Sequence, residues 1–137
     1  MGDISLEAAT KAVAATFGAL PKRDDFDETG KKVYDKVADP NRRSLVGLQG
    51  PGGIRLWSPQ VSEPNTAINN YLRWGTGFGD RLTEIAIMVT AREMDNKFEW
   101  NAHEIAGGKA GVEPAIIDII KYRKPAPKGA TAGLGEK

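Results

Sequence analysis

The chain has 137 residues, the length of one domain, and 19 basic against 18 acidic residues give it a formal charge of +1. This balance excludes the electrostatic footprint of a nucleic-acid-binding protein, which needs a clustered excess of Lys and Arg. The sequence contains no cysteine, which excludes disulfides and reactive thiols, and its single histidine excludes a metal site built on two or three His ligands.

No segment of the sequence is typical of a membrane span or a secretory signal. The longest purely apolar run covers only residues 85–89, whereas a helix needs about 20 apolar residues to cross a bilayer. Near the N-terminus, Asp3 and Glu7 stand where a secretory signal carries positive charge. We therefore expect a cytoplasmic protein with neither a membrane nor a nucleic-acid partner.

The first half of the chain predicts three helices and one irregular stretch. Abundant alanine favours a helix over 5–20, which Pro21 ends. A second helix is predicted over 27–38, where valine and tyrosine recur at helical spacing. Residues 45–64 are rich in glycine and proline, so we expect an irregular stretch that is either a loop or carries a short helix, and loops of this length often line a site. An apolar face then predicts a helix over 66–74.

The second half carries the strongest periodic signal. Asp80 occupies an N-cap position, and apolar residues follow at helical spacing up to about Glu93. The pair at 95–96 favours a break, after which a second helix is expected to end at the glycines between 107 and 111. Pro114 suits the first turn of a third helix. No segment alternates as a strand does, so the sequence predicts an all-α fold.

One helical domain is expected over 1–124, followed by a tail at 125–137. The tail is rich in Pro, Gly and Ala and carries excess positive charge. Such a composition is typical of a flexible segment.

His103 is the single histidine and a candidate general acid or base, because an imidazole pKa near ~6.5 suits proton transfer at neutral pH. Glu99 lies four residues earlier, on the same helical face. If the helices around 95–96 form an antiparallel hairpin, Glu84 comes within about one turn of His103. Two carboxylates and a histidine in apolar surroundings form an acid–base group. The alternative is structural: His103 makes a packing hydrogen bond, and Glu84 pairs with an arginine such as Arg73 or Arg81.

The segment 79–120 resembles the core of the carboxymuconolactone decarboxylase family. The similarity rests on the Arg-Leu-x-Glu motif at 81–84, the Glu-Trp-x-x-His motif at 99–103 and the Gly-Val turn at 111–112. Shorter matches upstream, including Gly-Pro at 50–51 and Tyr-Leu-Arg-Trp-Gly at 71–75, extend the resemblance over roughly residues 25–124.

The resemblance implies an alkyl hydroperoxidase D-like fold with a central antiparallel helical hairpin, assembled as a homo-oligomer, either trimer or hexamer. Family members continue with further helices, so we expect partner subunits to cover apolar faces of this chain. The peroxidase branch carries two cysteines, and here those positions hold Asn96 and Glu99. Peroxide reduction by a thiol is therefore excluded.

The decarboxylase branch implies a cofactor-independent lyase that removes CO2 from a small carboxylated lactone, 4-carboxymuconolactone, in aromatic-acid catabolism. By this resemblance His103 delivers a proton to the carbanion, and Glu99 or Glu84 orients it or relays the proton. Candidate substrate-binding residues are two arginines for the carboxylate and tryptophans that wall the pocket: Arg73, Arg55, Trp57, Trp74 and Trp100.

Two other functions stay open at this point. The same acid–base pair would serve an isomerase or hydrolase acting on a related enolisable acid. A non-enzymatic helical oligomer that binds a small ligand or a partner would use His103 and Glu84 only structurally. Each of these arginines also has a purely structural interpretation, as a member of a surface ion pair. Each tryptophan could likewise be an ordinary core residue.

Overall fold

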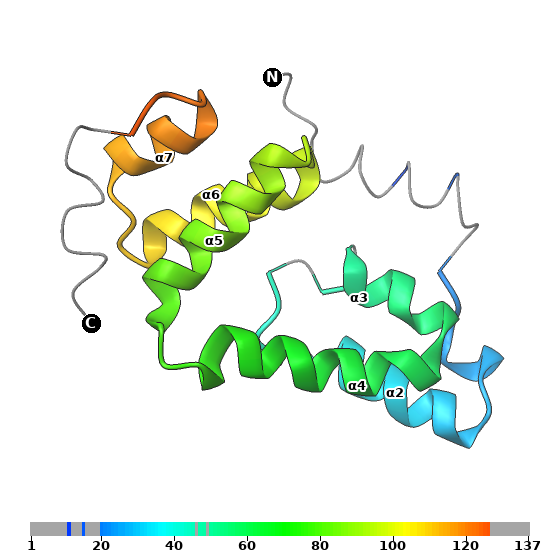
Figure 1. The fold of residues 1–137 in the computed structure, drawn as a ribbon. Coiled ribbons are helices and arrows are strands. Elements are labelled where there is room, and N and C mark those ends of the chain that lie inside the picture. The colour runs from blue at the N-terminus through cyan, green and yellow to red at the C-terminus, as the bar shows by residue number, and fades with distance from the viewer. Residues whose placement is uncertain (1–10, 12–14, 16–19, 46, 49, 127–137) are drawn as a thin grey trace.

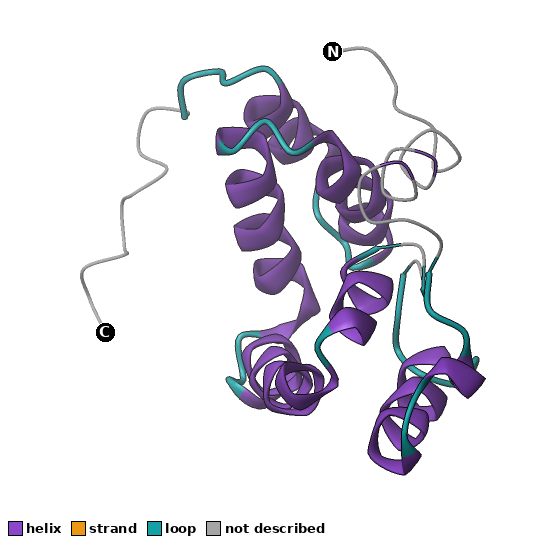
Figure 2. Ribbon diagram, turned by 90° about the vertical axis from the view of Figure 1, so that its right-hand side faces the viewer, coloured by secondary structure: helices purple, strands orange, loops and turns teal. Residues whose placement is uncertain are grey.

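The structure is a computed structural model of the chain, and it describes residues 11, 15, 20–45, 47–48 and 50–126. Every regular element in these ranges is a helix or helical turn, which confirms the all-α prediction (Figure 2). Apart from residues 11, 15 and 20, the helix expected over 5–20 lies outside the described residues, as does the tail from residue 127 onward. No helix in the described part of the chain has the length and hydropathy needed to cross a bilayer.

The N-terminal half packs a pair of longer helices around short ones. Its elements are η1 (Arg23–Asp25), α2 (Glu28–Ala38), α3 (Pro51–Ile54), η2 (Arg55–Trp57) and α4 (Pro59–Asn70). The helix predicted over 27–38 is confirmed as α2, and the Asp27 side chain caps it by accepting a hydrogen bond from the Gly30 amide at 2.7 Å. In Figure 1, α2 lies against α4.

Of the two possibilities for residues 45–64, a loop or a short helix, the structure has helix: α3 and η2 cover residues 51–57, and α4 begins at Pro59. Pro51 and Pro59 occupy the first positions of α3 and α4, where a proline's missing N–H has no helical partner to lose. The glycines of α3 serve close packing. A Cβ at Gly53 would lie 2.1 Å from the carbonyl oxygen of Leu48, so no larger residue fits there without a backbone shift.

At its C-terminal end α4 continues without a break into a single π-helical turn, η3 (Tyr71–Gly75). The helix predicted over 66–74 is therefore present, although its last turn is wound more widely than an α-helix. This turn carries Arg73 and Trp74. Gly77 and Gly79, both with φ near +80°, then redirect the chain into the next helix.

The C-terminal half is a helical hairpin covered by one further helix. Its elements are α5 (Gly79–Glu93), α6 (Lys97–Lys109) and α7 (Pro114–Lys121), and α5 and α6 pack side by side (Figure 1). The Asn96 side chain caps α6 by accepting from the Glu99 amide at 3.1 Å. Pro114 begins α7 as predicted.

Two details of the hairpin prediction are corrected. Asp80 is not an N-cap, because α5 already begins at Gly79 and Phe78 holds the cap position without a side-chain bond. Gly107 does not end α6 either. It lies inside the helix, where a Cβ would come within 2.8 Å of the Met88 side chain, so it lets α6 approach α5 closely. Gly111, with φ +85°, makes the turn that follows.

Two separate clusters of buried apolar residues support the two halves. The C-terminal cluster joins α5, α6 and the turn before α7, and its members are Met88, Ala91, Trp100 and Val112. Partly buried isoleucines pack against it. The N-terminal cluster lies between α2 and η2: Val33, Val37 and Leu56. Cores this small leave much apolar surface on the outside.

Candidate functional site

A buried carboxylate–histidine pair lies where α5 and α6 face each other. The Nδ1 atom of His103 lies 2.6 Å from Oε2 of Glu84. Both residues are buried, with 6% and 5% of their surface exposed. His103 shares one helical stripe with Trp100 and Gly107, at spacings of three and four, and this stripe is the face that α6 turns toward α5. The hairpin therefore brings Glu84 to His103, as its turn at 95–96 predicts.

Arg73 reaches the same carboxylate from η3. Its Nη2 donates to Oε1 of Glu84 at 2.7 Å, so each Glu84 oxygen has one partner. The guanidinium also lies over the Trp74 ring, 5.3 Å from its centroid. Its Nε is buried and has no hydrogen-bond partner. Of the two arginines proposed as structural partners of Glu84, the structure pairs Arg73 with it, whereas Arg81 pairs with Glu113.

Glu99 lies on the other side of the imidazole. Its Oε2 is 3.4 Å from Nε2 of His103, one helical turn away on α6. The Glu99 side chain is 30% exposed and lines a cavity of about 300 Å3. The other walls are mostly apolar residues of α5, such as Ala86 and Ile87, and Met94 directly after it. Each ring nitrogen of His103 thus faces a carboxylate, and one of these carboxylates reaches a cavity.

Opposing influences set the pKa of Glu84. Burial alone would raise the pKa of this carboxyl group, because it disfavours the charged form. The hydrogen bond with His103 and the charges of His103 and Arg73 outweigh burial and hold the pKa of Glu84 below its ordinary value. Glu84 is therefore an anion at neutral pH, and it fixes the tautomer in which His103 Nδ1 carries a proton.

The pKa of His103 moves the other way. Burial would lower the pKa of the imidazole, but the hydrogen bonds with Glu84 and Glu99 and the charge of Glu84 raise it above its ordinary value, against a smaller opposing effect from Arg73. With Nδ1–H committed to Glu84, the proton that titrates is the one on Nε2. That proton lies between His103 and Glu99, which is where an acid–base group would exchange it with a ligand.

Two residues expected in the pocket serve other roles. Trp100 belongs to the C-terminal core, and its Nε1 donates to Glu104 at 2.7 Å. Glu104, expected to be solvated, also accepts from Lys121 at 2.7 Å. Arg55 is held at α4, where its Nη1 donates to Asn65 at 2.8 Å. Asn65 lies eight residues before Arg73 along one helical stretch, about 12 Å away, so the structure does not bring Arg55 to the acid–base group.

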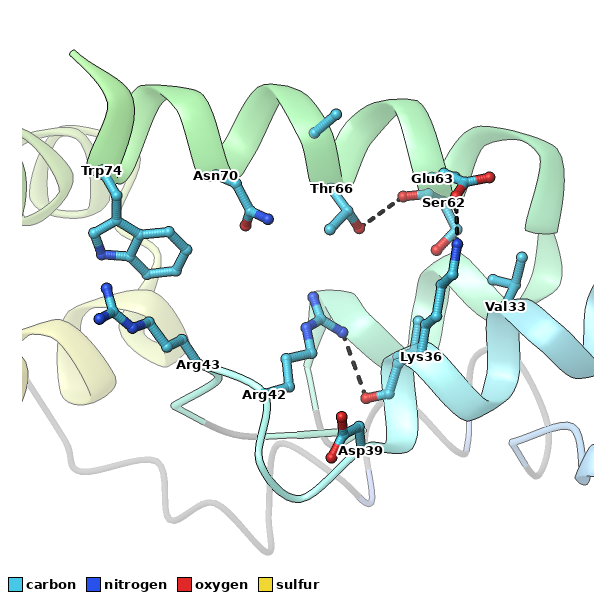
Figure 3. Close-up of a pocket in the computed structure, with 12 residues that line it drawn as sticks. Val33, Lys36, Asp39, Arg42, Arg43, Ser62, Glu63, Thr66, Asn70 and Trp74 are labelled. Carbon is cyan, nitrogen blue, oxygen red and sulfur yellow. Dashed lines mark hydrogen bonds and ion pairs between the residues drawn. The ribbon is translucent and has the colours of Figure 1, made fainter.

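Sequence reasoning missed a second hollow next to this group. A cleft of about 660 Å3 opens between α2 and α4, and Trp74 lines it together with Arg42 and Arg43 (Figure 3). The guanidinium of Arg43 lies 5.2 Å from the centroid of the Trp74 ring. The segment that carries both arginines has no periodic pattern, so nothing in its sequence pointed to the cleft.

Within the described residues, no group of three or more His, Cys, Asp or Glu side chains is placed to hold a metal ion. Comparison with known proteins gives no match: no family model, no curated protein and no solved structure is significantly similar to the chain.

Proposed function

We propose that the chain is a cofactor-independent lyase resembling 4-carboxymuconolactone decarboxylase, which removes CO2 from a small carboxylated lactone. The observation that supports this proposal is the buried His103 held between two carboxylates, with Glu84 at Nδ1 and Glu99 at Nε2. A histidine in this position can carry a proton at neutral pH and release it in one direction only, toward Glu99.

In the proposed reaction, the bond between the substrate carbon and its carboxylate breaks. CO2 leaves, and the electron pair of that bond spreads into the unsaturated lactone as a dienolate. His103 then delivers the Nε2 proton to the dienolate carbon, with Glu99 as the relay, and an enol-lactone forms. A proton from water restores His103.

The three charged residues around His103 have different roles in the proposed reaction. Glu99 faces the 300 Å3 cavity and passes the proton between His103 and the substrate. Glu84 orients the imidazole and stabilises its charged form. Arg73 acts through Glu84, since its Nη2 is committed to that carboxylate, and is a positioning residue rather than a substrate clamp.

The walls of the cavity favour this chemistry. Alanine and isoleucine side chains of α5 and the following Met94 lie beside Glu99 there. A localised carboxylate charge is poorly solvated by such walls, and the dienolate that replaces it spreads its charge over several atoms. The change in charge distribution thus helps CO2 to leave.

The test is an ultraviolet assay of the purified chain with 4-carboxymuconolactone. Glu99→Gln and His103→Ala are expected to lower kcat by about a hundredfold or more, the usual contribution of general acid–base catalysis. The matched control is Glu104→Gln, on the same helix, which keeps an acceptor for Trp100 and is expected to retain activity. Circular dichroism would verify that each variant is folded. Turnover at the wild-type rate in His103→Ala, or no turnover by the wild type, would overturn the proposal.

One observation favours the second candidate, a helical oligomer that binds a ligand or partner without catalysis. Large apolar side chains along α4 and η3 and just before α5 are more than half exposed, among them Ile68, Leu72 and Phe78. Exposed apolar residues in such number are typical of an interface. We propose that copies of this chain cover these faces in a homo-oligomer, whichever function the site has.

A further inference from the structure

The 660 Å3 cleft between α2 and α4 is lined by both charged and apolar side chains. Trp74 and Arg43 lie at one end in Figure 3, the guanidinium of Arg42 points into the middle, and Val33 lies at the other end. Asn70 extends its side-chain amide from α4 toward the cleft. We call this hollow the arginine cleft. Its volume is in the range that suits a small organic ligand.

The positive charge of the arginine cleft is not neutralised. Within the described residues, neither Arg42 nor Arg43 forms an ion pair. Arg43 contacts the Trp74 ring, and Arg42 makes one long hydrogen bond, from Nη1 to the Val37 carbonyl at 3.4 Å. By contrast, every other arginine side chain from Arg23 to Arg123 donates a hydrogen bond to a carboxylate or amide oxygen at 3.2 Å or less. Two adjacent guanidinium groups are thus left to a ligand.

The other charges around the cleft do not cancel this excess. Lys36 is paired with Glu63. The carboxylate of Asp39, which accepts from the Asn41 amide at 2.8 Å, offsets only one of the two guanidinium charges, so the lining keeps one positive charge in excess. A third guanidinium lies close by, because Nη1 of Arg55 is 3.5 Å from Oγ1 of Thr66, a residue that lines the cleft. Burial and the charge of Arg42 lower the pKa of Arg55. Cations gathered around a concave surface focus a positive potential into it.

We propose that the arginine cleft binds a small organic anion that carries a carboxylate on an apolar body. Arg42 and Arg43 hold the carboxylate, because a guanidinium offers two parallel N–H donors to its oxygens. The apolar body lies toward Val33, Val37 and Ala67, the aliphatic residues of the lining. These apolar side chains favour a carboxylate with a hydrocarbon body over inorganic phosphate, because phosphate would leave them exposed to water.

This site is separate from the reaction proposed above. Arg73 bonds Glu84 of the acid–base group and does not line the cleft, whereas the next residue, Trp74, does line it. The cleft would hold its ligand whether or not His103 transfers a proton.

The experiment uses 4-phenylbutyrate as the probe and the tryptophan indole N–H signals of the full 15N-labelled chain as the readout. The chain has three tryptophans, and a Trp74→Phe variant identifies the signal of Trp74. Trp57 lines a different cavity and Trp100 lies in the core, so their signals report binding elsewhere. We expect a saturable shift of the Trp74 signal with a Kd of the order of a millimolar, as the ligand efficiency of a probe this size gives.

Arg42→Gln with Arg43→Gln is expected to weaken binding by about tenfold or more, since each removes a charged hydrogen bond. Arg81→Gln, an arginine on α5 outside the cleft, is the matched control and is expected to leave Kd unchanged. Three results would overturn the proposal: no saturable Trp74 shift, equal binding of the neutral 4-phenylbutanamide, or equal affinity in the double variant. Inorganic phosphate that binds as tightly as 4-phenylbutyrate would overturn the assignment to a carboxylate with an apolar body.

Discussion

Replacing Glu84 by glutamine tests the central claim about the site, that one buried carboxylate holds both Arg73 and His103. The substitution keeps the shape of the side chain but leaves it one acceptor oxygen. If that oxygen faces Arg73, the new amide group points at Nδ1 of His103, which then accepts and must lose its proton. The variant therefore switches the imidazole to the Nε2–H tautomer and removes the charge that stabilises its cationic form.

The loss of stability can be worked from the contacts. Glu84 accepts two charged hydrogen bonds, at 2.6 and 2.7 Å, and glutamine keeps one acceptor. One such bond contributes about 1.5–3 kcal/mol. Removing one partner of a buried ion pair costs about 3–5 kcal/mol. The Arg73 side chain stays 19% exposed, so water recovers part of its solvation. We expect the free energy of unfolding to fall by about 3 kcal/mol, where the two ranges meet.

Two assays read the result. Urea unfolding gives the free energy, and proton NMR gives the pKa of His103, whose ring signal needs no assignment because the chain has one histidine. The wild-type pKa is expected above the ordinary value of 6.5, and the pKa in Glu84→Gln below it, since burial and Arg73 still lower it while only Glu99 raises it. Glu113→Gln, which breaks an exposed pair with Arg81, is the control and should cost about 1 kcal/mol or less. A loss below about 1 kcal/mol in Glu84→Gln with an unchanged His103 pKa would refute the reasoning.

Two further predictions concern pH and packing. The lowered pKa of Glu84 stabilises the fold above pH 4.5, the ordinary pKa of the carboxyl group, and this stability is lost as pH falls through the folded-state pKa. The raised pKa of His103 stabilises the fold below pH 6.5, the ordinary pKa of the imidazole, and this stability is lost as pH rises through the folded-state pKa. Thermal unfolding should therefore peak between these values, and His103→Gln should flatten the alkaline decline; the same decline in both proteins would count against it. Gly53→Ala should destabilise the fold by about 1–3 kcal/mol, because its Cβ meets a backbone carbonyl, whereas Gly108→Ala, with open space around it, should stabilise α6 by about 0.5–1 kcal/mol. Equal effects of the two alanines in urea unfolding would contradict the packing argument.

The hairpin and its charged pair follow from local pattern alone. The period of α5, the cap at Asn96 and the four-residue step from Glu99 to His103 are all short-range features, and they place Glu84 beside His103. The sequence left open whether Trp100 lies in the core or lines a pocket, because a tryptophan at helical spacing suits both positions equally. Its position three residues before His103 directs it to the core face.

The N-terminal half shows where local pattern fails. Proline and glycine in 45–64 suggested a loop or a short helix, but Pro51 and Pro59 begin helices and Pro64 lies inside α4. Gly52 and Gly53 permit close contact with backbone carbonyls five residues earlier, which a count of turn-forming residues does not reveal. The same holds for the arginines. Which of Arg73 and Arg81 would meet Glu84 depends on the path from α4 through η3 into α5. The approach of Arg43 to Trp74 joins residues that are distant in sequence.

The bond between Arg73 and Glu84 also joins the two halves of the molecule, since η3 continues α4, which packs on α2 of the N-terminal half, whereas α5 carries residues of the C-terminal cluster. The proton on His103 and the contact between the halves are therefore linked quantities. Any ligand or neighbouring subunit that draws η3 away from α5 weakens the hold of Arg73 on Glu84, which frees the carboxylate to bind the histidine proton more tightly. By reciprocity, titration of that one proton shifts the balance between the joined and separated arrangements of the two cores.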